Sequence, residues 1–285
     1  MDKTTFSCFV FGEILYDCFT DRTCLGGAAL NFAWNLRQLG FPVAMTSAVG
    51  RDDLGRQARD FLTRADIGQQ YVADRPEPTG TVDVFLQDGQ PSYTIRSGVA
   101  WDHIETQPAL DQPPDLIYYG TAAQRSAANR PSLDHLLAEK PRHRLFDVNL
   151  RKDAYTPETV LFGLEAATIV KLNDEEWEEV RLIADVDRPV DLIARFTLDC
   201  LAITLGAKGA QLHYAKTSFG KRFEPVPVID AVGAGDAFSG VLAAGAMLDT
   251  NQQQVLNLAC TAGAAAVQHP GAHLQLPDEV KAAFD

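Results

Sequence analysis

The chain has 285 residues, and its 38 acidic against 25 basic side chains give a formal net charge of −13. So acidic a protein repels nucleic-acid phosphates and anionic lipid, and no lysine- and arginine-rich run marks a basic patch, so neither nucleic acid nor a membrane is an expected partner. The composition, 46% hydrophobic and 22% charged, is typical of a globular protein with a large core.

The cysteines and the N-terminus indicate the cellular compartment. Five cysteines, an odd number without CxxC pairing, indicate reduced and mostly buried thiols. The first residues lack the basic segment and apolar stretch of a secretory signal, and no apolar run approaches the ~20 residues that span a bilayer. A soluble, cytoplasmic protein is therefore expected.

Strand-like and helix-like segments alternate from the N-terminus. Residues 6–15 are predicted as a strand, and the turn at Gly26-Gly27 then opens a helix over 28–39. Residues 43–49 predict a second strand, followed by a helix to about Arg64. Further predicted strands lie at 116–119, 145–148, 168–172 and 201–205. The predicted helices between and after them lie at about 129–139, 157–166, 174–184 and 189–196. This alternation is typical of a mostly parallel sheet with helices on both faces.

Two parts of the chain break this alternation. Residues 70–98 contain two alternating strand patterns around Asp88-Gly89, which predicts a hairpin in a small antiparallel insert. The C-terminal third contains a second hairpin pattern, over 209–214 and 223–229. Two alanine-rich helices follow, at about 236–248 and 252–267, and their all-round apolar character predicts burial.

The segment over residues 228–240 is the most informative for chemistry. A strand-like run meets Gly233-Ala234-Gly235, which opens an apolar helix with Asp236 in its first turn. Converging backbone N–H groups at such a turn suit a phosphate or a developing oxyanion. Asp236 has two interpretations: a favourable helix-dipole or capping interaction, or a base that accepts a proton from a substrate hydroxyl. The Rossmann GxGxxG and the P-loop GxxxxGK[ST] are both absent.

Other polar residues sit where strands end or helices begin. Asn31 lies one turn after Gly27 on the same predicted helix face, either as a satisfied structural residue or as a ligand group. Asp17 is expected at the carboxyl edge of the first strand, where open α/β sheets bind ligands, although a surface turn would also place an aspartate there. Asn173 and Glu176 have the spacing of an N-terminal capping box.

Together, and in this order, the motifs resemble the ribokinase/PfkB family of carbohydrate kinases over nearly the whole chain. Residues 25–40 look like the first family signature, with Gly-Gly-Ala followed by an asparagine in a helix that ends Leu-Gly. Residues 49–55 look like the family's VGxDxxG, and residues 228–240 resemble the second signature around Gly-Ala-Gly-Asp. Residues 173–176 match NxxE, and residues 201–209 resemble the nucleotide-site strand and loop.

The resemblance implies a fold class and an activity. The implied fold is a ribokinase-like three-layer α/β/α core with a mostly parallel sheet. It forms a single domain over residues 1–285, and a small antiparallel β lid comes from about 13–24 and 70–98. The implied activity is ATP-dependent phosphorylation of a sugar hydroxyl. The first candidate reaction is the conversion of D-fructose to fructose 6-phosphate. Segments that look most like bacterial fructokinases are 12–17, 78–81 and 146–151.

The resemblance also assigns roles to particular residues. Asp236 is the implied base, and Gly233, Ala234 and Gly235 form the implied anion hole. The residues implied to contact sugar are Asp17, Gly26, Gly27, Asn31, Arg151 and Asp236. The residues implied to border ATP are Asn173, Thr204, Gly206, Lys208, Gly209, Gly233, Gly235 and Asn257. Glu176 is implied to hold Mg²⁺ through water, and Asp230 marks a candidate site for a monovalent cation such as K⁺.

Several alternatives stay open at this level. The sequence Asp230-Ala231-Val232 lacks the hydroxyl residues that many members carry there, so only backbone carbonyls remain for a cation or nucleotide contact. In one alternative the acceptor is another sugar or a nucleoside, and Phe85 and Tyr93 are then either residues that stack on its base or hydrophobic packing within the lid. A non-catalytic sugar-binding regulator is the other. A homodimer through the lid is also compatible with the resemblance.

Overall fold

The computed structural model describes residues 2–87, 90–151, 154–223 and 226–285. In this part of the chain the larger sheet has the strand order β13-β12-β11-β10-β9-β8-β1-β4-β5. Neighbours from β11 to β5 are parallel, whereas β12 and β13 add antiparallel strands at one edge. Its strands are β1 (Cys8–Phe11), β4 (Val43–Gly50), β5 (Gly68–Arg75), β8 (Leu116–Gly120), β9 (His143–Asp147), β10 (Ile169–Asn173), β11 (Cys200–Thr204), β12 (Ala210–His213) and β13 (Ser218–Lys221).

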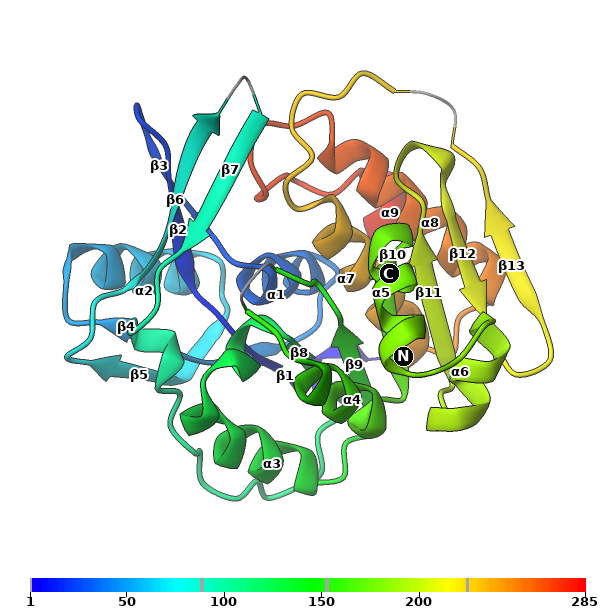
Figure 1. The fold of residues 1–285 in the computed structure, drawn as a ribbon, viewed down its shortest axis with the longest axis horizontal. Coiled ribbons are helices and arrows are strands. Elements are labelled where there is room, and N and C mark those ends of the chain that lie inside the picture. The colour runs from blue at the N-terminus through cyan, green and yellow to red at the C-terminus, as the bar shows by residue number, and fades with distance from the viewer. Residues whose placement is uncertain (1, 88–89, 152–153, 224–225) are drawn as a thin grey trace.

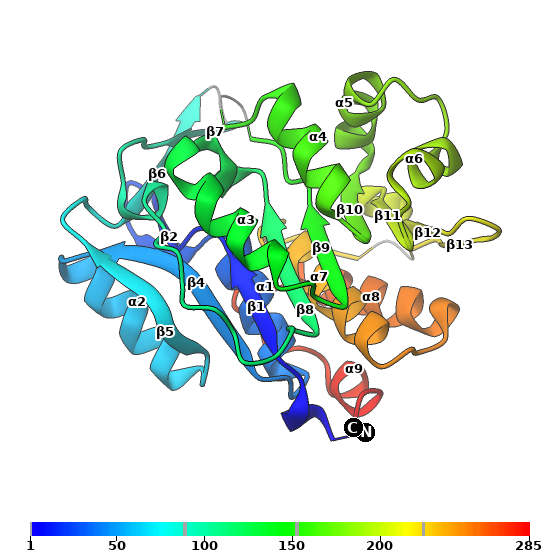
Figure 2. The ribbon, with the colours of Figure 1, turned by 90° about the horizontal axis from the view of Figure 1, so that it is seen from below.

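Helices cover both faces of this sheet, as Figure 2 shows. The α-helices are α1 (Ala28–Gln38), α2 (Asp53–Arg64), α3 (Arg130–Ala138), α4 (Pro157–Ala166), α5 (Asp174–Ile183), α6 (Pro189–Phe196), α7 (Ala234–Met247), α8 (Gln252–Ala266) and α9 (Asp278–Ala282). The short 3₁₀ helices are η1 (Lys3–Thr5), η2 (Ala100–Asp102), η3 (Ala122–Arg125), η4 (Ala127–Asn129) and η5 (Gly206–Lys208).

Each face of the sheet has its own apolar core. One core joins Phe32 of α1 and Val241 of α7 to strand residues such as Ile169. The other joins helices α3 to α6 to strand residues such as Val170. Because successive residues of a strand point to opposite faces, both faces of β10 are covered, which explains its nearly continuous apolar run. This architecture confirms the predicted three-layer α/β/α core.

A second sheet of four strands stands apart from the larger one (Figure 1). Its order is β3 (Thr23–Gly26), β2 (Leu15–Cys18), β6 (Gly80–Gln87) and β7 (Gln90–Ile95). The β2–β6 pair is parallel and the other two pairs are antiparallel. The predicted hairpin therefore forms, while its turn at Asp88-Gly89 lies outside the described residues.

Three predicted boundaries are wrong. Residues 6–15 are not one strand, because the chain leaves the larger sheet after β1, at Gly12, and enters the small sheet as β2. A Cβ at Gly12 would lie 2.5 Å from the Cβ of Ala29, so glycine lets strand and helix approach there. The lid range 70–98 begins too early, since β5 pairs with β4 in the larger sheet.

The third error concerns residues 223–229, which were predicted as a strand. The partner of β12 is β13 instead, which makes a shorter hairpin. Val228 and Ile229 are both 66% exposed, and the N–H of Ile229 donates to the carbonyl of Val267. Residues 226–229 are therefore an irregular, largely exposed connection leading to α7 and not a strand, while residues 224–225 of the predicted strand lie outside the described residues.

Two expectations from composition can be checked directly. All five cysteines are free thiols, three buried and two partly buried. None of the helices in the described ranges combines the length and the apolarity needed to cross a membrane.

Candidate active site

The start of α7 lies at the edge where the central parallel strands end. Gly233 precedes this helix at φ +82°, and a Cβ there would lie 2.8 Å from Ala272. A Cβ at Gly235 would lie 2.7 Å from the Nζ atom of Lys171. Glycine is therefore required at Gly233, where the backbone is left-handed, whereas a side chain at Gly235 would displace the flexible end of Lys171. We call residues 233–235 the glycine turn.

Asp236 sits in the first turn of α7 and is partly buried. Its Oδ2 atom accepts a hydrogen bond of 2.8 Å from Nδ2 of Asn31 in α1, so it joins two helices 205 positions apart in sequence. Burial, with the nearby Asp147 carboxylate, raises the pKa of Asp236 to about 7, while Lys171 opposes the rise. Helix capping alone does not explain such an environment.

Asn31 has one further property that bears on ligand binding. Its Oδ1 atom is buried and has no hydrogen-bond partner among the described residues. A buried amide oxygen without a partner carries a desolvation cost, which a ligand hydroxyl would remove. The amide nitrogen of Asn31 thus binds the carboxylate of Asp236, while its amide oxygen is left to accept a hydrogen bond from a ligand.

Beneath the glycine turn lies a buried polar group that sequence reasoning missed. The Nζ atom of Lys171 donates to Oδ1 of Asp147 at 3.1 Å, and the hydroxyl of Ser239 donates to Oδ2 of the same carboxylate at 2.9 Å. Asp147 is fully buried and Lys171 is 7% exposed. The available signal was a charged residue inside each of two apolar strand runs, where a buried parallel strand normally has none.

Asn173 and Glu176 form the predicted capping box at the start of α5. Oδ1 of Asn173 accepts the N–H of Glu176, and Oε2 of Glu176 accepts the N–H of Asn173, both at 2.8 Å. Oε1 of Glu176 also accepts the N–H of Leu150 at 2.9 Å, which fixes the loop before Arg151. Burial raises the pKa of Glu176, and Lys171 opposes that rise.

Asp17 is not at the carboxyl edge of a strand of the larger sheet, where it was predicted. It lies in β2 of the small sheet, because the chain changes sheets at Gly12. A Cβ at Gly26 would lie 3.3 Å from its Oδ2 atom. Burial raises the pKa of Asp17, and the nearby Arg151 guanidinium opposes the rise. The small sheet therefore brings a carboxylate of its own toward the loop that carries Arg151.

The structure brings together only some of the residues predicted to border a nucleotide. Thr204 and Asn173 are direct partners at the ends of β11 and β10. Gly206 and Lys208 are exposed in the following 3₁₀ turn, which ends at Gly209 with φ +109°. Asn257 is exposed on α8, and the contact described for its side chain is with Gln253 of the same helix.

Asp230, the candidate cation residue, already has backbone partners. Its Oδ1 atom accepts the N–H of Val232 at 3.0 Å, and Oδ2 accepts the N–H of Gly271 at 3.1 Å. Asp230 thus ties the segment before the glycine turn to the segment after α8. Among the described residues, no three His, Cys, Asp or Glu side chains gather as a ready metal site.

Two anchors attach the small sheet to the core. At the entry to β6, the hydroxyl of Thr79 donates to Oδ1 of Asp52 at 2.6 Å, and its N–H donates to Oδ2 at 2.8 Å. The same hydroxyl accepts the N–H of Gly50 at 2.9 Å. The two motifs at 49–55 and 78–81 therefore meet in space, where β6 begins.

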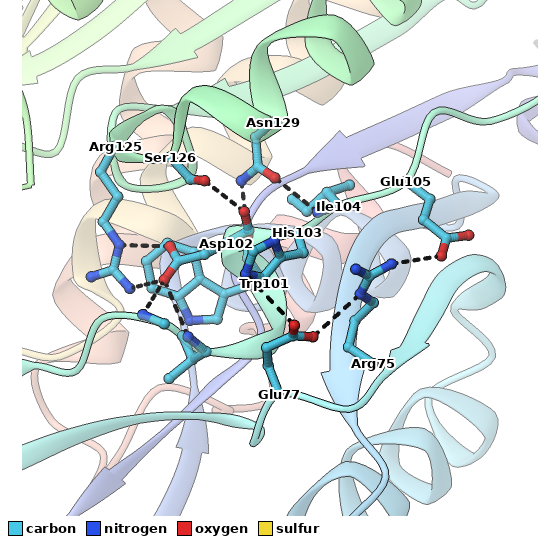
Figure 3. Close-up of polar contacts among 12 residues, drawn as sticks. Arg75, Glu77, Trp101, Asp102, His103, Ile104, Glu105, Arg125, Ser126 and Asn129 are labelled. Atoms are coloured by element: carbon cyan, nitrogen blue, oxygen red, sulfur yellow. Dashed lines mark hydrogen bonds and ion pairs between the residues drawn. The ribbon is translucent and has the colours of Figure 1, made fainter.

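The second anchor follows β7, where the chain returns to the core (Figure 3). Nε and Nη2 of Arg125 donate to the two carboxylate oxygens of Asp102 at 2.8 and 2.9 Å, and its guanidinium lies 3.8 Å from the ring centroid of Trp101. Nη2 also donates to the carbonyl of Arg96 at 2.6 Å. Sequence reasoning missed this anchor, because no local pattern links residues more than 20 positions apart.

A glycine turn beside a carboxylate at the end of a parallel sheet, with a small β-sheet attached by two anchors, defines a ribokinase-like α/β fold. The chain belongs to the pfkB family of carbohydrate kinases, whose family model matches residues 4–279. It is similar to the fructokinase of Salmonella typhimurium, with 30% identity over 94% of this chain and 95% of the relative. The fructokinase of Escherichia coli is 28% identical with the same coverage.

A solved structure supports the fold. The fructokinase from Vibrio cholerae O395, in its fructose-, ADP- and calcium-bound form, superposes with a TM-score of 0.83 at 24% identity. The match covers 97% of this chain and 98% of that one. The predicted family and the predicted fold class are both confirmed, and the protein is a carbohydrate kinase of the PfkB type.

Proposed function

We propose that this protein transfers the terminal phosphoryl group of ATP to a primary hydroxyl of a sugar, with D-fructose, converted to fructose 6-phosphate, as the first candidate. The single observation that carries the proposal is the carboxylate of Asp236 beside the glycine turn, held by Asn31 and with its pKa near neutrality. The similarity to two fructokinases supports fructose as the acceptor.

Asp236 is the base in this proposal. The sugar oxygen attacks the terminal phosphorus, the bond from that phosphorus to the ADP oxygen breaks, and the hydroxyl proton passes to the carboxylate. Backbone N–H groups of the glycine turn take the negative charge on the phosphoryl oxygens. Because the transition state of phosphoryl transfer is loose, positioning and charge stabilisation contribute more than covalent help.

The sugar is held from both sheets. We assign its hydroxyls to Asp17 and Gly26 of the small sheet, to Gly27 and Asn31 at the start of α1, and to Arg151. The free Oδ1 atom of Asn31 supports this assignment, since it lacks a donor in the described structure. Closure of the small sheet over the sugar would exclude water and so limit hydrolysis of ATP.

The nucleotide is assigned to the opposite side of the glycine turn. Thr204, Gly206, Lys208 and Gly209 would border it, with Asn173 toward its phosphates. Asn257 is proposed at the adenine end, since no contact described for it commits its side chain to the core. Lys208 is exposed and free to meet a phosphate.

We assign Mg²⁺ to the oxygens of Glu176 and Asn173, with water molecules between the ion and the side chains. Carboxylate and amide oxygens suit Mg²⁺, but both oxygens of Glu176 and the Oδ1 atom of Asn173 accept backbone N–H groups. Mg²⁺ bound with ATP would neutralise phosphate charge. A K⁺ ion near Asp230 would rest mainly on backbone carbonyls, because both carboxylate oxygens there accept N–H groups.

The test is ADP release from MgATP with fructose, mannose, ribose and adenosine as competing acceptors. Fructose is expected to give the largest kcat/KM, and kcat/KM is expected to rise with pH through about 7 as Asp236 loses its proton. Asp236→Asn should lower kcat by about 10²–10⁴-fold. Asp60→Asn, at an exposed carboxylate of α2, is the matched control.

Each alternative has its own outcome in this assay. Faster turnover with adenosine or another sugar would reassign the acceptor and keep the kinase. Sugar binding without any turnover, detected as a thermal shift, would favour a non-catalytic binding protein. Near-normal turnover by Asp236→Asn would end the assignment of the base.

A further inference from the structure

The pair formed by Lys171 and Asp147 is unusual for its place in the sheet. The two residues are direct neighbours on the parallel strands β10 and β9. Ile169 and Leu145, two positions earlier on each strand, belong to the core on the α7 face, so strand alternation puts both charged side chains on that face. The interior of a parallel sheet normally carries apolar residues there, so a buried ion pair calls for a reason.

The ammonium group of Lys171 lies against the glycine turn. A Cβ at Gly235 would come 2.7 Å from Nζ, so the ammonium group in this position lies directly against the backbone of the glycine turn. The hydrogen bonds in the described part of the chain use one of the three N–H groups of Lys171, the one that Asp147 accepts. The ammonium group therefore keeps two N–H donors next to the glycine turn.

The surrounding carboxylates keep this lysine charged. Burial lowers the pKa of Lys171, but Asp147, Glu176 and Asp236 outweigh burial and hold that pKa above its ordinary value. A purely structural counter-ion would have the same charge. A structural counter-ion, however, would not need to lie against the glycine turn, at a residue, Gly235, that has no side chain.

We propose that Lys171 is a further catalytic residue, whose ammonium group donates to the terminal phosphoryl group while the glycine turn binds the same group from above. Asp147 is its positioning residue. The inference rests on the proposed function, because it requires a nucleotide at the glycine turn. A fixed point charge next to the transferred group stabilises the charge that spreads over the phosphoryl oxygens.

The test measures nucleotide binding directly, by calorimetry with Mg²⁺ and either ADP or the non-hydrolysable ATP analogue AMP-PNP. Lys171→Met is expected to weaken AMP-PNP binding at least tenfold and ADP binding less than threefold, because only AMP-PNP carries the third, γ-phosphoryl group. Asp147→Asn should also weaken AMP-PNP binding more than ADP binding, and so lower the preference for AMP-PNP over ADP. Simple destabilisation of the fold would not change this preference.

Two further variants keep the experiment decisive. If loss of one charge prevents Lys171→Met from folding, the double variant Lys171→Met/Asp147→Asn, which removes both charges, should fold and show the same loss of preference. Lys216→Met is the matched control, since it removes an exposed ammonium group in the turn between β12 and β13, away from Asp147 and the glycine turn. Its preference for AMP-PNP should stay within threefold of wild type.

Equal weakening of ADP and AMP-PNP, or none of either, would overturn the role of Lys171 and leave the kinase proposal intact. Failure of the wild-type protein to bind either nucleotide would instead refute the proposed function and with it this inference. Binding with the expected loss of preference but without sugar turnover would support Lys171 and count against the acceptor.

Discussion

Replacing Asp236 by asparagine should stabilise the fold while it removes activity. Its pKa is raised from 3.8 to about 7, chiefly by burial, so the folded chain holds this proton more tightly than the unfolded chain. Stability therefore falls as pH rises from about 4 to about 7 and stays low above that range. Asparagine does not titrate, and it can still accept the hydrogen bond from Asn31.

The size of the effect follows from the pKa. At 1.36 kcal/mol per tenfold change, the rise corresponds to about 4 kcal/mol at pH 8. Partial exposure of the side chain and relaxation around it reduce this to about 2 kcal/mol. For a chain of this length, about 2 °C per kcal/mol converts that value to a rise in Tm of about 4 °C.

The assay is a thermal melt of Asp236→Asn and wild type at several pH values between 4 and 8. The Tm difference should be near zero at pH 4, grow through pH 7, and level off by pH 8. Asp60→Asn should show no such dependence. An Asp236→Asn variant that melts at or below the wild-type temperature at pH 8 would refute the view that this carboxylate is held at a cost to stability.

Three further predictions concern the frame around the site. Thr79→Ala should lower the free energy of unfolding by about 1–3 kcal/mol, because the Gly50 N–H and the Asp52 carboxylate lose their hydrogen bonds to the hydroxyl, whereas Thr79→Ser should stay near wild type in the same urea titration. Arg125→Met should cost about 3–5 kcal/mol in urea unfolding, because it leaves the buried carboxylate of Asp102 without its cation; a loss under 1 kcal/mol would show that water replaces it. Gly209→Ala should cost at least about 1–3 kcal/mol, since its φ of +109° is strained for alanine and a Cβ would collide with the backbone of β13; Gly220→Ala, in open space, is the control, and equal melting temperatures would contradict the reasoning.

Local sequence signals were sufficient for the elements and for part of the site. The alternation of strands and helices, the Gly233–Gly235 turn before an apolar helix, and the capping box of Asn173 and Glu176 all depend on residues within one turn or one strand of each other. Periodicity, turn chemistry and capping act over such distances, so they can be read without the fold. The error at 226–229 has the same origin, because neighbouring apolar residues such as Val228 and Ile229 look alike in a strand and in an exposed connection.

The long-range contacts were decided only by the tertiary structure. Asn31 meets Asp236 across 205 positions, Thr79 meets Asp52 across 27, and Lys171 meets Asp147 because β9 and β10 are neighbours in register. No local pattern encodes which strands become neighbours, since burying the apolar faces of all the helices at once selects the strand order. The sequence by itself thus determined the glycine turn and the carboxylate of Asp236. Packing determined that the amide of Asn31 faces this carboxylate and that the ammonium group of Lys171 lies against the turn.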